Sequence, residues 1–254
     1  MSPLYPPYPR SIEARYGPVR RARFCYLYTA GGKRLTDLYQ EAGRGILGWG
    51  AGSGGRALKN ALSRGANGSF GNLAEEARLR KAVSALIPGT AVSGWYTGER
   101  AASLLGGAFQ PGGPPWRLWR PWAAAPAESP AVFLPPLPLA RDLVIGAGRD
   151  GADLPEESSL LPPPVLRALT RSLYDLASEL PKRGEAGWSL YDGVILRFWK
   201  REGPYLFPKV PPRDYGDFAE TCLERGLVIS PSYGIPSIVP WQANPGDFSA
   251  LAKL

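Results

Sequence analysis

The chain has 254 residues, of which 44% are hydrophobic and 20% are charged. These proportions are typical of a globular protein with a substantial core, and they exclude global disorder. The chain contains no histidine, which excludes serine–histidine and cysteine–histidine nucleophile pairs and removes the usual general base and zinc ligand. Any catalysis would therefore depend on a cofactor or on carboxylate, lysine or tyrosine side chains.

The formal net charge of +8 raises nucleic acid as an alternative partner. In the segment WRLWRPW, Trp116, Trp119 and Trp122 alternate with Arg117 and Arg120, and aromatic faces beside guanidinium groups can bind single strands. Arginine outnumbers lysine 23 to 7 over the whole chain, so an arginine pair is expected from composition alone. Composition therefore disfavours nucleic acid as the partner. A nucleic-acid or protein-binding role for this loop is kept as an alternative.

Two features bear on the compartment. Cys25 and Cys222 each lie in an apolar stretch, far apart in sequence, which predicts two free core thiols and neither a disulfide framework nor a metal site. The start MSPLYPPYPR has no apolar signal region, and nowhere do eighteen apolar residues follow one another. We therefore expect a cytoplasmic protein that does not associate with a membrane.

The first half of the chain predicts short strands and helices. Residues 1–22 form a Pro/Tyr-rich arm that we expect to be irregular, and FCYLYT and RLTDLY then predict a hairpin around AGGK. RALKNALSRG and NLAEEARLRKAVSALIPG have the apolar spacing of helices, with Asn72 as N-cap and Glu75 three residues later. AVSGWYT at 91–97 predicts a buried strand that turns directly into a helix.

The second half continues with loops and further short elements. We expect loops at 110–130 and 151–164, strands at 131–134 and 142–146, and a helix over 165–180 with a leucine stripe. Beyond it, short strands and the helix DYGDFAETCLERG predict a small α+β subdomain at 181–254, so that 23–180 forms the large domain. The adjacent carboxylates Glu75 and Glu76 are expected on a solvated helix face, because neighbouring helical residues point about 100° apart.

The turn Thr97-Gly98-Glu99 is the main candidate for a ligand site. A hydroxyl and a glycine between a buried strand and a helix can present backbone N–H groups and the positive end of the helix dipole to a phosphate. The same residues suit an ordinary helix start, with Thr97 as the cap and Gly98 allowing the bend. The residues alone favour the ordinary helix start, with a phosphate site as the alternative.

Three segments resemble class III aminotransferases of fold type I. YLYTAGGKRLTDLYQEAGRGILGWG is similar to the family's N-terminal signature, AVSGWYTGERAASLLGGA to its strand, phosphate turn and helix, and CLERGLVISPSYGIPSIVP to its small-domain ending. Together they cover about half of the chain. The resemblance implies an α/β aminotransferase-like fold with a reduced central parallel or mixed sheet, a small α+β subdomain, a homodimer or pairing with a related aminotransferase subunit, and pyridoxal phosphate as cofactor.

The resemblance also implies roles for individual residues. Thr97, Gly98 and Glu99 correspond to the cofactor's phosphate turn, whereas the family's Schiff-base lysine and pyridine-binding acid belong to the span that follows. That span here contains no lysine before Lys182, which leaves Lys209 as the remaining candidate and Asp142 as the only acid near a central strand. The chain thus resembles a shortened, degenerate and non-catalytic relative that serves as a partner or ligand-binding subunit. An active enzyme with a relocated or partner-supplied lysine is the alternative.

Overall fold

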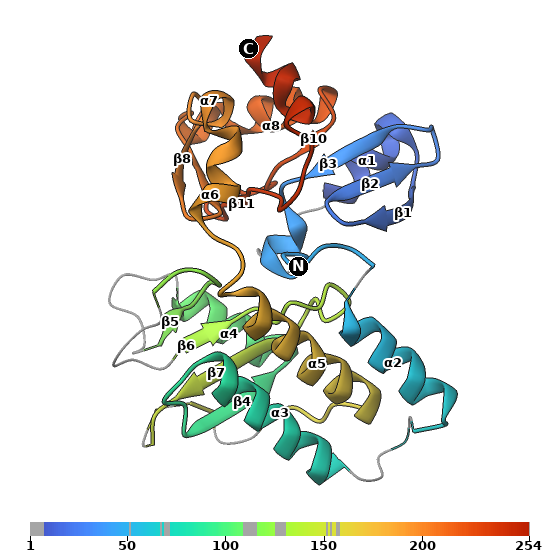
Figure 1. The fold of residues 1–254 in the computed structure, drawn as a ribbon, viewed down its shortest axis with the longest axis vertical. Helices are drawn as coiled ribbons and strands as arrows, with labels where there is room; N and C mark the ends of the chain where they lie inside the picture. Colours follow the sequence, from blue (N-terminus) through green and yellow to red (C-terminus); the bar gives the residue numbers. More distant parts are fainter. Residues whose placement is uncertain are drawn as a thin grey trace. The chain divides into compact units, whose positions relative to one another are not determined.

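The computed structural model describes residues 8–50, 52–66, 68, 72–108, 116–124, 131–150, 152, 154–155 and 158–253. The chain divides into two compact units (Figure 1). Unit 1 combines Met1–Ala51 with Arg183–Leu254, and unit 2 is the continuous segment Gly52–Lys182. Among the described residues, no helix combines the length and the apolar character needed to cross a membrane.

Unit 1 contains a four-stranded mixed sheet in the order β1-β2-β3-β10. Its first three strands are antiparallel neighbours, and β10 pairs in parallel with β3 through Leu227 opposite Thr36. The hairpin expected from FCYLYT and RLTDLY is confirmed as β2 and β3. The elements are α1 (Tyr8–Tyr16), β1 (Val19–Arg23), β2 (Tyr26–Thr29), β3 (Arg34–Asp37) and β10 (Leu227–Val228).

The N-terminal arm was expected to be irregular, and this expectation is wrong for residues 8–22, most of which belong to α1 and β1. Proline is tolerated in the first helical turn, so Pro9 does not prevent α1 from forming. Ile12 is 5% exposed, and the Tyr16 hydroxyl donates to the Leu223 carbonyl at 3.0 Å. Tertiary packing against the C-terminal part of the chain therefore orders this segment.

The remainder of unit 1 is a set of short helices around a second sheet, in the order β11-β9-β8 with antiparallel pairing. The short strands and the helix expected in this region are confirmed. Because β10 adds to the N-terminal sheet, residues 1–51 group with 183–254, which differs from the expected large domain over 23–180. The elements are α6 (Glu185–Trp188), α7 (Asp192–Ile195), β8 (Trp199–Glu202), β9 (Tyr205–Pro208), α8 (Tyr215–Glu224), β11 (Ser237–Ile238) and 3-10 helices at Gln40–Gly43, Ser189–Tyr191, Pro212–Asp214 and Pro245–Lys253.

The two cysteines are free and buried in unit 1, as their apolar surroundings in the sequence predicted. Burial raises the pKa of Cys25 to about 11 and that of Cys222 to about 12. Both thiols therefore stay protonated at neutral pH and act as small hydrophobic side chains.

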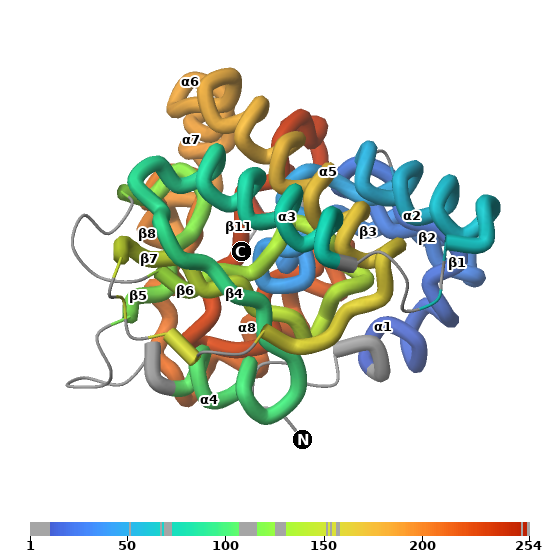
Figure 2. The backbone as a smooth tube through the Cα atoms, turned by 90° about the horizontal axis from the view of Figure 1, so that it is seen from below, coloured from blue at the N-terminus to red at the C-terminus, as the bar shows by residue number. Residues whose placement is uncertain are grey.

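Unit 2 is built on a mixed sheet in the order β4-β7-β6-β5. β7 pairs antiparallel with both β4 and β6, and β5 pairs in parallel with β6. The sheet lies between α3 and α4, which cover its opposite faces (Figure 2). The expected central mixed sheet is confirmed. The strands are β4 (Val92–Tyr96), β5 (Arg117–Leu118), β6 (Ala131–Phe133) and β7 (Val144–Gly148), and α4 spans Gly98–Ala108.

Three helices pack side by side in unit 2, with α5 (Pro163–Glu179) between α2 (Ser53–Ser63) and α3 (Asn72–Leu86) (Figures 1 and 2). All three were expected from the apolar spacing of the sequence. The leucine stripe of α5 is fully buried at Leu166, Leu169 and Leu173, so this helix supplies the core of the layer. Its apolar face explains why the sequence pattern located it well.

The tryptophans of WRLWRPW belong to the packing of unit 2. Trp119 is 5% exposed and lies edge-on to Phe133 at 5.5 Å between ring centroids. The indole N–H groups of Trp116 and Trp122 donate to the Leu104 and Leu180 carbonyls, each at 3.1 Å. This packing counts against the loop as a stacking platform for single strands.

Candidate functional site

The expected phosphate turn lies where β4 ends and α4 begins. Trp95 and Tyr96 are each 1% exposed, whereas Thr97 is half-buried and Gly98 and Glu99 are exposed. Gly98 has a φ of +60°, and a Cβ at this position would meet no atom within 4 Å. The turn therefore requires glycine for its backbone conformation and leaves open space above the start of the helix.

Two serines that the sequence analysis did not identify hold this turn. The Thr97 N–H donates to Ser159 Oγ at 3.0 Å, and the Trp95 N–H donates to Ser158 Oγ at 3.3 Å. The Ser159 backbone also pairs with Trp95, donating its N–H to the Trp95 carbonyl at 2.8 Å. Segment 158–159 thus runs along the end of β4. Its only signal in the sequence was a pair of hydroxyls in a proline-rich loop.

The start of α4 can bind an anion in principle. The first N–H groups of a helix lack intrahelical partners and carry a partial positive charge, which is the arrangement that phosphate groups use. Glu99 lies in the first turn of α4 and already brings a negative charge to this end, so the helix start is favourable without a ligand. Cofactor binding by Thr97, Gly98 and Glu99 therefore remains a prediction.

No described lysine side chain is placed to form a Schiff base. All six described lysine side chains are exposed, namely those of Lys33, Lys59, Lys81, Lys182, Lys200 and Lys209. The Lys209 ammonium donates to the Leu196 carbonyl at 2.6 Å, and Lys182 pairs with Glu179 at 3.0 Å. Asp142, the only acid that the sequence places near a central strand, is exposed as well. The described residues therefore include no buried lysine that could hold pyridoxal phosphate covalently.

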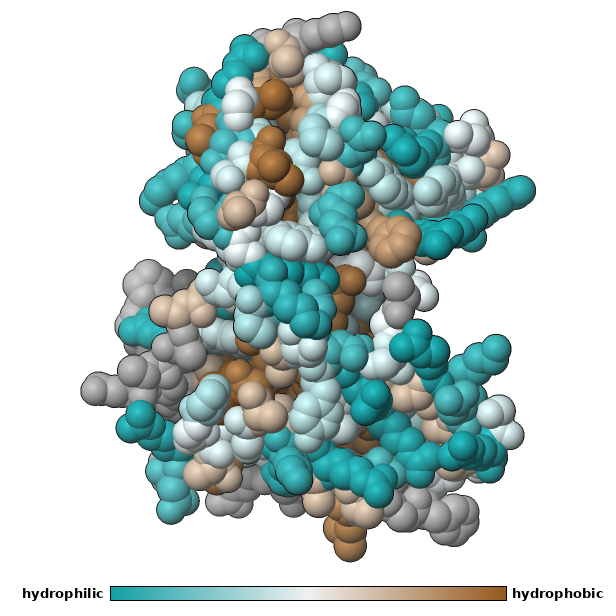
Figure 3. Space-filling view, in the orientation of Figure 1, coloured by the Kyte–Doolittle hydropathy of each residue, from teal (hydrophilic) through white to brown (hydrophobic). Residues whose placement is uncertain are grey.

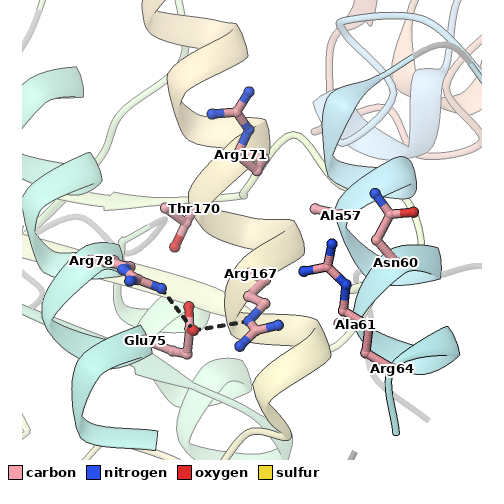
Figure 4. A pocket seen from close by; sticks show the side chains of 9 residues that line it. All are labelled: Ala57, Asn60, Ala61, Arg64, Glu75, Arg78, Arg167, Thr170 and Arg171. Carbon is pink, nitrogen blue, oxygen red and sulfur yellow. Dashed lines mark hydrogen bonds and ion pairs between the residues drawn. The ribbon is translucent and has the colours of Figure 1, made fainter. Parts of the chain in front are cut away.

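A second candidate site is a cavity of about 240 Å³ between α2, α3 and α5 (Figure 4). Glu75 was expected on a solvated face, and this expectation is wrong, because its side chain is only 6% exposed. Its Oε1 accepts from Arg78 Nη1 and from Arg167 Nε, each at 2.9 Å. The sequence carries no local signal for this site, since Arg167 lies 92 residues beyond Glu75. The lining residues are Ala57, Asn60, Ala61, Arg64, Glu75, Arg78, Arg167, Thr170 and Arg171.

No model of a known protein family matches the sequence. Two curated relatives span nearly the whole chain. An uncharacterized protein of Treponema pallidum (strain Nichols) is 28% identical, with 92% of each chain covered. An uncharacterized protein of Borreliella burgdorferi is 23% identical, with 93% of this chain and 89% of the relative covered.

Solved aminotransferase structures are similar in fold. An omega-transaminase from Sphaerobacter thermophilus has a TM-score of 0.61 at 12% identity, covering 92% of this chain and 89% of the other. An acetylornithine aminotransferase from Elizabethkingia anophelis has a TM-score of 0.61 at 11% identity, and an ornithine aminotransferase from Plasmodium yoelii has 0.64 at 10%; each match covers 96% of both chains. The chain therefore has an aminotransferase-like mixed α/β fold, as expected, while such low identity says nothing of activity.

Proposed function

We propose that this protein is a non-catalytic relative of pyridoxal-phosphate-dependent aminotransferases that binds a small anionic ligand at the Thr97–Glu99 turn without covalent attachment. The observation that supports this most directly is the exposure of all six described lysine side chains. A Schiff-base lysine reacts as a neutral amine, which enzymes obtain by desolvating it or placing it beside another cation. An ammonium in open water has neither advantage.

Covalent capture tests the absence of a Schiff base. The protein is incubated with pyridoxal phosphate, reduced with borohydride and analysed by peptide mass spectrometry. We expect only substoichiometric labelling spread over exposed lysines, equal in Lys209→Arg and in the control Lys81→Arg, since both side chains are exposed. A stoichiometric adduct on one lysine would establish the alternative, an active enzyme with a relocated lysine; an adduct abolished only by Lys209→Arg would assign it to that residue.

The turn itself is tested by a matched pair of glycine substitutions in α4. Gly98→Ala places a side chain at a φ of +60°, whereas Gly106→Ala meets no atom within 4 Å and needs no unusual backbone. We expect Gly98→Ala to weaken noncovalent pyridoxamine phosphate binding at least fivefold and Gly106→Ala to leave it unchanged, as measured by calorimetry. Unphosphorylated pyridoxamine should not distinguish the two variants. Equal phosphate-ester binding by both would remove the turn from the proposal.

We further propose that the chain self-associates as a homodimer in the reducing interior of the cell. Sedimentation equilibrium of the purified protein tests the assembly. A mass of one chain at every concentration would contradict it, and co-purification with a different aminotransferase-like chain would favour a mixed pair instead.

A further inference from the structure

The cavity between α2, α3 and α5 carries an excess of positive charge. Four arginines and one glutamate line it, so its net charge is three positive units if every group is ionised. The surface over these three helices is largely hydrophilic (Figure 3). The positively charged arginines repel one another unless negative charge is bound among them. The single glutamate leaves most of their charge unneutralised, so an anionic ligand would stabilise the cavity.

Glu75 cannot supply that charge, because two arginines already share it. Arg78 and Arg167 both donate to its Oε1, and its side chain is nearly enclosed. Arg167 uses only its Nε for this bond, which leaves both of its terminal nitrogens without a hydrogen bond among the described residues. The carboxylate thus fixes the orientation of the Arg167 guanidinium while its Nη groups stay available.

The two remaining arginines have no ion pair within the described part of the chain. Arg64 follows the last residue of α2, and its guanidinium lies in the space between α2 and α5 (Figure 4). Arg171 is one helical turn beyond Arg167 on α5. Arg64 and Arg171 are both exposed. The arginines that line this open cavity therefore come from α3, from α5 and from the end of α2.

The geometry points to a binding site for a small phosphorylated ligand in this cavity, distinct from the turn at Thr97. Guanidinium groups match phosphate oxygens in a bidentate manner and are never deprotonated in proteins. The cavity volume of about 240 Å³ exceeds the space that one phosphate fills, which suits a diphosphate group or a phosphate ester of a small molecule. The alanines at 57 and 61 form an apolar wall, against which the non-phosphate part of an ester would pack.

The test compares the double variant Arg64→Ala/Arg171→Ala with wild type, using inorganic pyrophosphate as the probe in calorimetry at low salt. Neither arginine pairs with Glu75, so both can be removed without leaving a buried carboxylate unpaired. We expect at least a tenfold loss of pyrophosphate affinity in the double variant. Pyrophosphate should raise the melting temperature of the wild type but not that of the double variant.

Two controls make the test specific. Arg20→Ala/Arg21→Ala removes the same charge from exposed positions of β1 and should retain binding, which separates the cavity from general attraction to a basic protein. Gly98→Ala should also retain pyrophosphate binding, so that failure of the turn and failure of the cavity are distinguishable. Equal affinity in wild type and the cavity variant would overturn the proposal. Binding of a single-stranded oligonucleotide, without pyrophosphate binding, would overturn it in favour of nucleic acid.

Discussion

Asp37 combines complete burial with a full set of hydrogen bonds. It is 2% exposed, and its Oδ1 accepts from the Tyr39 and Gln40 N–H groups, each at 2.9 Å, while Oδ2 accepts from Trp49 Nε1 at 2.7 Å. Burial raises the pKa of Asp37 to about 6 from its usual 3.8, although the three donors oppose this shift. The side chain fixes the start of the segment Gln40–Gly43, where all four residues have positive φ, and thereby stabilises a conformation that Gln40 and its neighbours rarely adopt.

The raised pKa predicts a pH-dependent stability of unit 1. Because the folded-state pKa exceeds the unfolded value, protonated Asp37 favours folding below about pH 4, and this contribution is lost as the pH rises to about 6. A shift of two units corresponds to about 3 kcal/mol. Asp37→Asn should therefore abolish a fall of this order in the free energy of unfolding between pH 4 and 6, measured by urea denaturation. Asp217→Asn, which changes an exposed carboxylate on α8, should show the same fall in the free energy of unfolding between pH 4 and 6 as the wild type. The same fall in Asp37→Asn would contradict the assignment.

At the scale of elements, α2 and α5 approach each other closely at Gly54. A Cβ on Gly54 would lie 2.9 Å from the Ala168 carbonyl oxygen and would also meet Ser172 Oγ. The backbone of α5 cannot move aside easily, because Ala168 and Ser172 lie in its buried face. Gly54 therefore sets the distance between two of the helices that line the cavity between α2, α3 and α5.

Neighbouring glycines in α2 provide a matched test of this packing. Gly54→Ala should destabilise unit 2 by about 2 to 3 kcal/mol through overpacking. Gly55→Ala, with no atom within 4 Å of its Cβ, should stabilise the helix by about 0.5 to 1 kcal/mol, because alanine has the higher helix propensity. Thermal denaturation followed by circular dichroism measures both. Similar effects of the two substitutions would show that helix propensity, and not the contact with α5, determines the outcome.

Local patterns predicted the elements better than they predicted the sites. The leucine stripe at Leu166, Leu169 and Leu173 located α5 because a buried helical face repeats every three to four residues. Glu75 was wrongly predicted to be solvated. Its carboxylate is buried because it pairs with Arg167, and the two side chains meet only when α3 packs on α5. Ser159 was missed for the same reason, since its hydroxyl becomes relevant only beside β4. Sequence periodicity reports which face of an element is buried, but not which distant polar side chain that face meets.

At the scale of the whole molecule, the two units differ in how the chain builds them. Unit 2 is continuous, whereas unit 1 joins residues before 52 to residues after 182. Its core cluster includes Ile12, Leu27 and Leu35 from the first part, together with Leu223 and Val228 from the second. Folding of unit 1 must therefore close a long loop through unit 2, and burial of this shared core helps to offset the entropic cost.

Removal of residues 1–16 should therefore weaken unit 1 selectively. The deletion eliminates Ile12 from the core and the Tyr16 hydrogen bond to Leu223, and we expect faster amide hydrogen exchange in β2, β3 and α8, with α3 and α5 unchanged. Arg15→Ala is the control for charge: its ion pairs with Glu220 and Glu224 involve partners whose side chains are 49% and 60% exposed, so solvent screens both pairs and their loss should leave the exchange rates unchanged. Since each unit has its own core, faster exchange throughout both units would instead mean that they unfold as one cooperative structure. Exchange confined to unit 1 in the deletion, and absent in Arg15→Ala, would assign the stabilising role of the N-terminal helix to its buried apolar face.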